Sequence, residues 1–176
     1  MLSVRKQTIS LILIFFAVYM KIEFWSIGKQ HDPAIKEAIE EYTKRITKYN
    51  PAKWEIIPVP KNASTLSEID LKRAEGKVIL DKLDKDDILV ALDEYGKEMS
   101  SIKLSDFIIK QGNLGIKKLI FLIGGAFGLD DSVLKRANHT WSLSPLTFPH
   151  QLVRLILSEQ IYRAYTIIKN EKYHHR

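Results

Sequence analysis

The feature that most constrains the fold is an uninterrupted apolar run, Leu119–Ile123, which ends in Gly124 and Gly125. A short run without polar residues is typical of a strand buried on both faces, as in a parallel sheet. Glycines let the backbone turn sharply and approach a ligand closely, and Asp130 is a good N-cap for a helix that follows. The stretch therefore predicts a strand, a glycine turn and a helix, which is the repeating unit of α/β proteins.

The same alternation continues along the chain. Strands are expected at 22–27, 54–59, 87–93, 119–123 and 140–143. Helices are expected at 33–46, 67–83, 100–112, 130–138 and 150–170. Pro58 and Pro60 should keep the second strand short or place it at a sheet edge, and Glu94–Lys97 should turn away from the third strand. The pattern predicts an α/β fold with a single parallel sheet between two layers of helices.

A second candidate ligand loop follows the fifth expected strand. It spans Leu143–Phe148 and is stiffened by Pro145 and Pro149. Open α/β sheets bind ligands in a crevice at the carboxyl ends of their strands, so this loop and the glycine turn are expected to form one site. A simpler interpretation is that the glycines only connect two elements, because Gly-Gly-x-x-Gly differs from the Gly-x-Gly-x-x-Gly fingerprint of dinucleotide-binding proteins.

Composition narrows the class of protein. The chain has 176 residues, 45% of them hydrophobic and 27% charged, as expected for one globular domain. It has no cysteine, which excludes disulfides, a thiolate nucleophile and cysteine-based zinc sites, and no metal site is expected. The net charge is +6, and the segment 135–176 carries seven basic residues against two acidic ones. Such a surface suits phosphate groups, although an ordinary solvated helix face can have the same composition.

Residues 1–19 differ from the rest of the chain. Arg5 and Lys6 precede an apolar run, 11–18, that resembles the start of a secretory signal but is too short to span a bilayer. No small-residue cleavage site follows, and a clean domain sequence begins at Met20. We interpret 1–19 as an upstream start-site extension, with a short hydrophobic leader or anchor as the alternative. Residues 20–176 are then a single domain.

The last expected helix, 150–170, is apolar around most of its circumference. A helix that packs on one sheet needs only one apolar stripe. The excess therefore predicts a second partner, and we expect a homodimer through this helix. The alternative is a core helix buried entirely by its own domain. The apolar residues are Leu152, Val153, Leu155, Ile156, Leu157, Ile161, Tyr162, Tyr165, Ile167 and Ile168.

Several linked motifs are similar to those of one known family. They are Leu-Ile-Gly-Gly-x-x-Gly-Leu at 122–129, Trp-Ser-Leu-Ser-x-Leu-Thr-Phe-Pro-His-x-Leu-x-Arg at 141–154, Glu-Gln-x-Tyr-Arg-Ala at 159–164 and the final Tyr-His-His-Arg. From Met20 onward the sequence resembles the RlmH family, the small SPOUT-class methyltransferases of 23S rRNA. Residues 1–19 have no counterpart in that family.

The resemblance implies a parallel α/β sheet flanked by helices, with a C-terminal part threaded as a trefoil knot, an exception to the rule against threaded chains. It also implies S-adenosylmethionine as cofactor, bound in the knot. By the same resemblance, the cofactor contacts fall on Leu92, on Gly124 and on the loop after the fifth strand. The loop residues are Leu143, Ser144, Pro145, Leu146, Thr147 and Phe148.

The family's reaction is methylation of N3 of a pseudouridine in an intersubunit hairpin of 23S rRNA, on the assembled 70S ribosome in the cytoplasm. N3 must lose its proton before it attacks, so a base or cationic groups are expected near the cofactor. The candidate residues are His150, Arg154, Tyr173 and His174. Each has a simpler explanation: His150 could cap the helix, Arg154 could pair with a carboxylate, and the terminal residues could be a solvated tail. The expected phosphate contacts are Lys135, Arg136, Arg163, Lys169 and Arg176.

Three other functions are consistent with parts of the sequence. A nucleotide- or flavin-dependent enzyme would use the glycine turn, but the chain lacks that fingerprint and an acidic ribose partner after the first strand. A non-catalytic ribosome-binding factor would not need intact cofactor loops. A membrane-anchored protein is suggested only by residues 1–19.

Overall fold

The computed structural model describes residues 20–174, so the expectation for residues 1–19 lies outside the described part. The elements, in chain order, are β1 (Lys21–Ile27), α2 (Pro33–Ile46), β2 (Ala52–Ile57), the 3₁₀ turn η1 (Ala63–Thr65), α3 (Glu68–Lys82), β3 (Ile88–Glu98), α4 (Ser101–Asn113), β4 (Lys118–Ile123), α5 (Asp131–Arg136), β5 (His139–Ser142) and α6 (His150–Ile168). The strands form one parallel sheet in the order β2-β1-β4-β3-β5. The predicted α/β class is confirmed, and β2 lies at an edge as its flanking prolines indicated.

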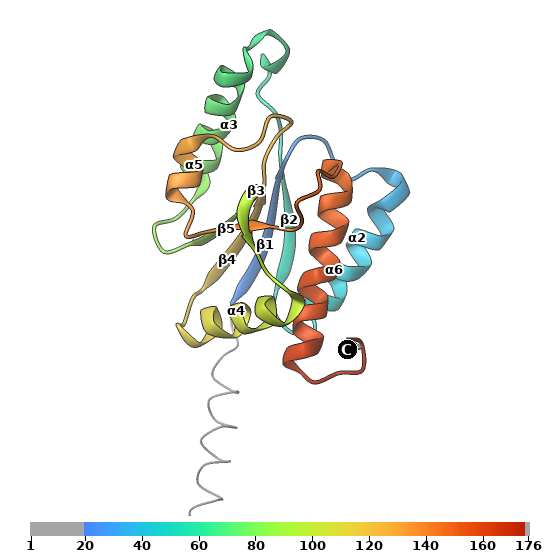
Figure 1. The fold of residues 1–176 in the computed structure, drawn as a ribbon. Coiled ribbons are helices and arrows are strands. Elements are labelled where there is room, and N and C mark those ends of the chain that lie inside the picture. The colour runs from blue at the N-terminus through green and yellow to red at the C-terminus, as the bar shows by residue number, and fades with distance from the viewer. Residues whose placement is uncertain (1–19, 175–176) are drawn as a thin grey trace, which may run out of the picture.

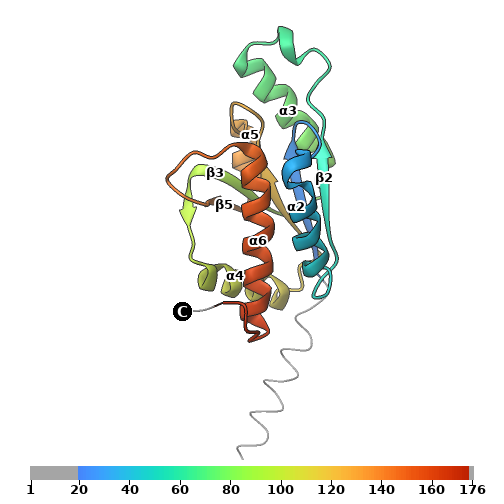
Figure 2. The same cartoon turned by 90° about the vertical axis from the view of Figure 1, so that its right-hand side faces the viewer.

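Helices cover both faces of this sheet (Figure 1). The helices α2, α4 and α6 pack on one face, and α3 and α5 pack on the other. Figure 2 shows α2 and α6 side by side, with α4 crossing near the lower end of α6. The molecule therefore has the three layers that the alternating sequence pattern predicted.

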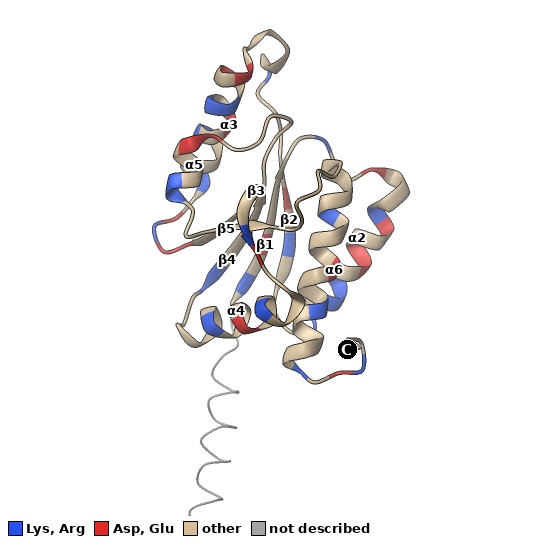
Figure 3. Cartoon of the chain, in the orientation of Figure 1, with Lys and Arg blue, Asp and Glu red and all other residues tan. Residues whose placement is uncertain are grey.

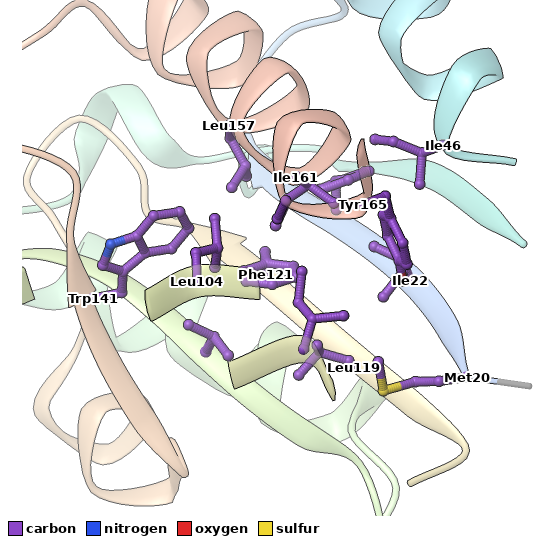
Figure 4. Packing of buried hydrophobic residues seen from close by; sticks show 14 of the residues in the cluster. Met20, Ile22, Ile46, Leu104, Leu119, Phe121, Trp141, Leu157, Ile161 and Tyr165 are labelled. Atoms are coloured by element: carbon purple, nitrogen blue, oxygen red, sulfur yellow. The ribbon is translucent and has the colours of Figure 1, made fainter. Parts of the chain in front are cut away.

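The larger of the two cores lies beneath α6 (Figure 4). Leu157 and Ile161 of α6 point toward Phe121 of β4, and Trp141 of β5 closes the same cluster. Phe121 and Trp141 make an edge-to-face contact with ring centroids 6.0 Å apart. Because full burial of such side chains contributes roughly 1.5–3 kcal/mol each, this cluster holds α6 firmly on the sheet.

The third strand is longer than the sequence indicated. After Leu92 the pairing with β5 shifts, so that Trp141 pairs with both Leu92 and Lys97 and residues 93–96 form a bulge. Gly96 makes this possible, because a Cβ at that position would lie 2.7 Å from the backbone nitrogen and carbon of Trp141. The expected turn away from the third strand at Glu94–Lys97 is wrong, since pairing with a distant strand pulls the segment back into the sheet.

Charges are mixed over much of the surface (Figure 3). Both basic and acidic residues occur on α2, α3 and α5, whereas α6 carries few charges. The charge pattern therefore does not mark a single face of the protein. No helix in the described part is long and apolar enough to cross a membrane. Within residues 20–174 no group of three or more His, Cys, Asp or Glu side chains could hold a metal ion.

Candidate cofactor cleft

One cleft lies at the carboxyl ends of β3, β4 and β5, and it brings together both loops singled out by the sequence. Its volume is about 420 Å³, within the range of small-molecule sites. Figure 2 shows the end of β3 and the loop before α6 projecting on the same side of the molecule. The lining residues are Leu92, Asp93, Glu94, Ile123, Gly124, Gly125, Ala126, Phe127, Gly128, Trp141, Ser142, Leu143, Ser144, Leu146, Thr147, Phe148, His150 and Val153.

The glycine turn forms one wall of this cleft. It closes through a hydrogen bond from the Gly128 backbone N–H to the Gly125 carbonyl, with an N···O distance of 3.0 Å. Gly128 has a φ of +82°, which side-chain-bearing residues rarely adopt. A Cβ on Gly124 would lie 2.9 Å from the Gly128 carbonyl carbon. The turn is therefore tighter than a residue with a side chain would allow at position 124, and the turn lines the cleft.

The loop between β5 and α6 forms the opposite wall. Its shape is held locally, because Ser142 Oγ donates to the Ser144 carbonyl and Ser144 Oγ accepts from the Leu146 backbone N–H, each at 3.0 Å. Every loop residue expected to contact the cofactor lines the cleft except Pro145. Asp93 and Glu94, which the sequence analysis did not single out, also line it. Their position directly after a buried strand was the available signal.

The core beside the cleft holds a polar atom without a partner. Trp141 is only 3% exposed, and its Nε1–H has no hydrogen-bond partner in the described part of the chain. A buried donor left unpaired costs roughly 1–3 kcal/mol. The atom has essentially no exposed surface, so a molecule in the cleft would reach it only if the ring shifted.

His150 and Arg154 do not share an environment. His150 begins α6 and lines the cleft, whereas Arg154 is 1% exposed and points toward the end of β1. The Arg154 guanidinium donates to Ser26 Oγ at 3.0 Å and to the Lys29 carbonyl at 2.9 Å. No carboxylate lies within ion-pair distance of it among residues 20–174. Burial lowers the pKa of Arg154, and burial and this neighbouring cation lower the pKa of His31.

Tyr173 lies at the other end of α6, away from the cleft of its own chain. Its hydroxyl donates to Glu159 Oε1 at 3.1 Å and lies 3.4 Å from the Tyr42 hydroxyl. Arg163 pairs with Glu159 at 2.5 Å and lies over the Tyr173 ring, 4.8 Å from its centroid. Burial and the hydrogen bond with Tyr42 raise the pKa of the Tyr173 phenol, which is therefore protonated at neutral pH. The spacing of Glu159 and Arg163 was the sequence signal for this cluster.

His174 follows this cluster at the end of the described chain. Its Nδ1 is buried and has no hydrogen-bond partner among the described residues. Along α6, nine residues separate His150 from Glu159, which corresponds to about 14 Å. The four candidate catalytic residues are thus divided among the cleft, the end of β1 and the far end of α6.

Two of the expected phosphate contacts are engaged within the chain. Arg136 donates to the Asp84 carbonyl at 3.0 Å and to the Asp87 carbonyl at 3.2 Å. Arg163 is paired with Glu159 as described above. Arg176 lies outside the described residues. Lys169 is exposed, and Lys135 lines a shallow groove between α3 and α5.

Comparison with known proteins gives consistent matches along the domain. The family described as "Predicted SPOUT methyltransferase" matches residues 20–174. A "Ribosomal RNA large subunit methyltransferase H" of Cytophaga hutchinsonii is 49% identical over 156 residues, which is 89% of this chain and 100% of that protein. The protein of the same name from Flavobacterium johnsoniae is 45% identical over 157 residues, again 89% of this chain and all of the relative.

A more distant match has the same extent. The "Ribosomal RNA large subunit methyltransferase H 1" of Clostridium perfringens is 43% identical over 160 residues, covering 88% of this chain and 99% of that protein. The match begins where the described domain begins and includes both walls of the cleft. The chain therefore belongs to the RlmH family of SPOUT methyltransferases.

Proposed function

We propose that this protein is an S-adenosylmethionine-dependent methyltransferase that modifies N3 of a pseudouridine in 23S rRNA on the assembled 70S ribosome. Family membership and relatives named as large-subunit rRNA methyltransferases support methyl transfer to rRNA. The observation that carries the proposal is the single cleft shared by the glycine turn and the loop before α6. The cofactor and the modified atom follow from the family resemblance. Since ribosomes are its substrate, we expect the protein to act in the cytoplasm.

The cleft fits the proposed cofactor in size and chemistry. Leu92, Leu143 and Phe148 offer an apolar surface for the adenine ring, and the glycine turn offers backbone groups at close range. Asp93 and Glu94 provide negative charge beside a cationic sulfonium group. We therefore propose that the cofactor contacts are Leu92, Gly124, Leu143, Ser144, Leu146, Thr147 and Phe148, and we include Pro145, which does not line the cleft, from the family resemblance alone.

The protein's part in the reaction is mainly positioning. When bound, S-adenosylmethionine supplies an electrophilic methyl group. The cleft walls must hold the reacting centre beside the incoming base and exclude water. We propose that His150, which lines the cleft, and His174 act on the N3 proton, and that the protonated Tyr173 hydroxyl turns from Glu159 to donate a hydrogen bond to the substrate. Arg154 then acts through the β1–α2 loop that it holds, without touching the substrate.

A second copy of the chain would bring the separated candidates together. Leu152 on α6 is 42% exposed, and Leu155 and Ile156 are only half buried by their own domain. We propose a homodimer through α6, in which the Tyr173 end of one copy reaches the cleft of the other. This pairing would remove apolar surface from water. It would also let the second copy supply a hydrogen-bond partner for the unpaired His174 Nδ1. We further propose that the chain around the cleft is threaded as a trefoil knot.

The decisive test uses ribosomes from a strain that lacks the protein. Purified protein and labelled S-adenosylmethionine are added to these 70S particles, and the methylated nucleotide is located by mass spectrometry of 23S rRNA. We expect incorporation at one pseudouridine, at N3. Absence of label, or label at another base, would contradict the proposal. Calorimetric titration with S-adenosylmethionine and with NAD separates the methyltransferase from a nucleotide-dependent oxidoreductase.

Variants connect the activity to this cleft. Gly124→Ala introduces a Cβ 2.9 Å from the Gly128 carbonyl carbon, so the turn must open and cofactor binding should be lost. Gly115→Ala is a control outside the cleft: a Cβ there meets nothing within 4 Å, and its φ of +71° strains only a distant turn, so Tm should fall while cofactor binding is kept. In the proposed dimer, mixing a Gly124→Ala copy with a Tyr173→Phe copy should restore part of the activity, since one complete site can form.

A further inference from the structure

A buried carboxyl group lies directly behind the glycine turn. Glu75 is in the middle of α3, and it is only 5% exposed. Among residues 20–174 its carboxylate has no ion-pair partner and accepts no hydrogen bond. Its oxygens are not fully sealed from solvent, but a carboxyl group this desolvated and without a partner among the described residues is still disfavoured when charged, so it calls for an explanation beyond packing.

Two adjacent residues of α3, Glu75 and Gly76, pack against the segment that connects β4 to α5. A Cβ on Gly125 would overlap Oε2 of Glu75 and would lie 2.8 Å from its Oε1, so the carboxyl group rests against Gly125. A Cβ on the next residue of α3, Gly76, would lie 2.9 Å from the Asp130 Cβ and 3.3 Å from the Val133 Cγ2. Glu75 therefore contacts the start of the segment that carries the glycine turn, and Gly76 contacts its end.

Glu75 and the cleft lie on opposite sides of one residue. Gly125 lines the cleft, whereas Glu75 does not. The side of Gly125 on which a Cβ would project is the side occupied by the carboxylate. A negative charge here would act on a molecule bound against Gly125 through the protein, which screens it less than water does.

We propose that Glu75 is a positioning residue of the methyl-donor site: its carboxylate, packed behind Gly125, attracts the cationic cofactor and keeps the glycine turn in its binding shape. This inference rests on the proposed function and assigns a role to a helix outside the cleft. An uncharged side chain of equal size would fill the same space with a smaller loss of folding free energy. Burial raises the pKa of Glu75, so ionisation of its carboxyl group destabilises the fold. The carboxyl group is retained because the cofactor benefits from its charge.

The test is Glu75→Gln, which keeps the shape and removes the charge. Its affinity for S-adenosylmethionine, measured by calorimetry at pH 7.5, should fall about tenfold, the order of effect of one unit charge in a partly buried site. Its Tm at the same pH should be equal to or above that of the wild type. A merely structural role would move affinity and Tm in the same direction, so this opposite response identifies the proposed one. Glu68→Gln, an exposed glutamate on the same helix, is the matched control and should change neither.

The pH dependence of the affinity for S-adenosylmethionine provides a second test. Affinity of the wild type should rise with pH as Glu75 ionises, and in Glu75→Gln this part of the rise should be absent. Other charged groups lie around the turn, so only the difference between the two proteins is assigned to Glu75. They are Lys72 on α3, Asp130, Asp131 and Lys135 at α5, and Asp93 and Glu94 across the cleft.

The possible outcomes separate the two proposals. If the wild type binds and transfers methyl groups but Glu75→Gln binds as tightly at every pH, the role of Glu75 is refuted while the function stands. If Tm falls together with affinity, Glu75 is only a packing residue. If the wild type does not bind S-adenosylmethionine, the proposed function fails and the role of Glu75 fails with it.

Discussion

Replacing Arg154 by alanine tests whether this residue holds the fold together at the entrance to α6. The guanidinium is 1% exposed and donates to Ser26 Oγ and to the Lys29 carbonyl, so it joins α6 to the end of β1. It also lies 3.4 Å from His31 Nδ1 in the same loop. A side chain that makes these contacts is not free to reach a substrate without dismantling them.

The expected destabilisation follows from three terms. Truncating a large buried side chain costs roughly 2–5 kcal/mol, and leaving the Lys29 carbonyl without its donor costs roughly 1–3 kcal/mol. Relief of the desolvation of an unpaired cation offsets part of this sum. We expect a net loss of about 3 kcal/mol, which for a domain of this size lowers Tm by about 6–12 °C.

Chemical denaturation and differential scanning calorimetry measure this effect directly. Arg73→Ala is the matched control, because the Arg73 side chain is 71% exposed and its loss should change the free energy of unfolding by less than about 0.5 kcal/mol. If Arg154→Ala is as stable as Arg73→Ala but loses methyl transfer, Arg154 contacts the substrate and the structural explanation is refuted.

Three further predictions concern other parts of the fold. Gly96→Ala should cost about 3 kcal/mol or more, because its Cβ would lie 2.7 Å from the backbone of Trp141; unchanged urea denaturation would show that the β3–β5 bulge can open freely. Asp130→Ala should cost about 1 kcal/mol at pH 7, because Asp130 accepts from the Ser132 hydroxyl and backbone N–H at the start of α5. These hydrogen bonds lower the pKa of Asp130, so its contribution is present above its usual pKa and is lost as the pH falls through the lowered value; a pH-independent difference between wild type and variant would contradict this. Leu152→Glu should convert a dimer to a monomer in light scattering and lower Tm by no more than the interface contributes, and a variant that remains dimeric would exclude α6 as the interface.

Local sequence patterns were sufficient for most elements. The start of α2 is an example: Asp32 accepts from the Ala34 backbone N–H at 2.8 Å, and Pro33 occupies the first helical position where its missing N–H has no cost. Asp130 likewise caps α5 as expected. These features depend on residues within a few positions of one another, so the sequence specifies them without reference to the rest of the fold.

Features that depend on distant partners were missed or assigned differently. The continuation of β3 beyond Leu92 requires pairing with β5, which is more than forty residues further along the chain. Arg154 looked like a catalytic cation because its type and spacing suit an anion, but the residues that occupy its donors lie on β1 and the following loop. The carboxyl group of Glu75 has no local signal, since its contact is with Gly125 on another element.

The sequence by itself determined the α/β class, the parallel sheet, the two ligand loops and the family, because periodicity, glycine turns and motifs are local properties. Only the tertiary structure decided which side chains share a space: it joined the two loops in one cleft, buried Arg154 away from it, and placed Tyr173 at the far end of α6. The physical reason is that a side chain's role depends on its neighbours in space, and for these residues the neighbours come from strands and helices distant in the chain.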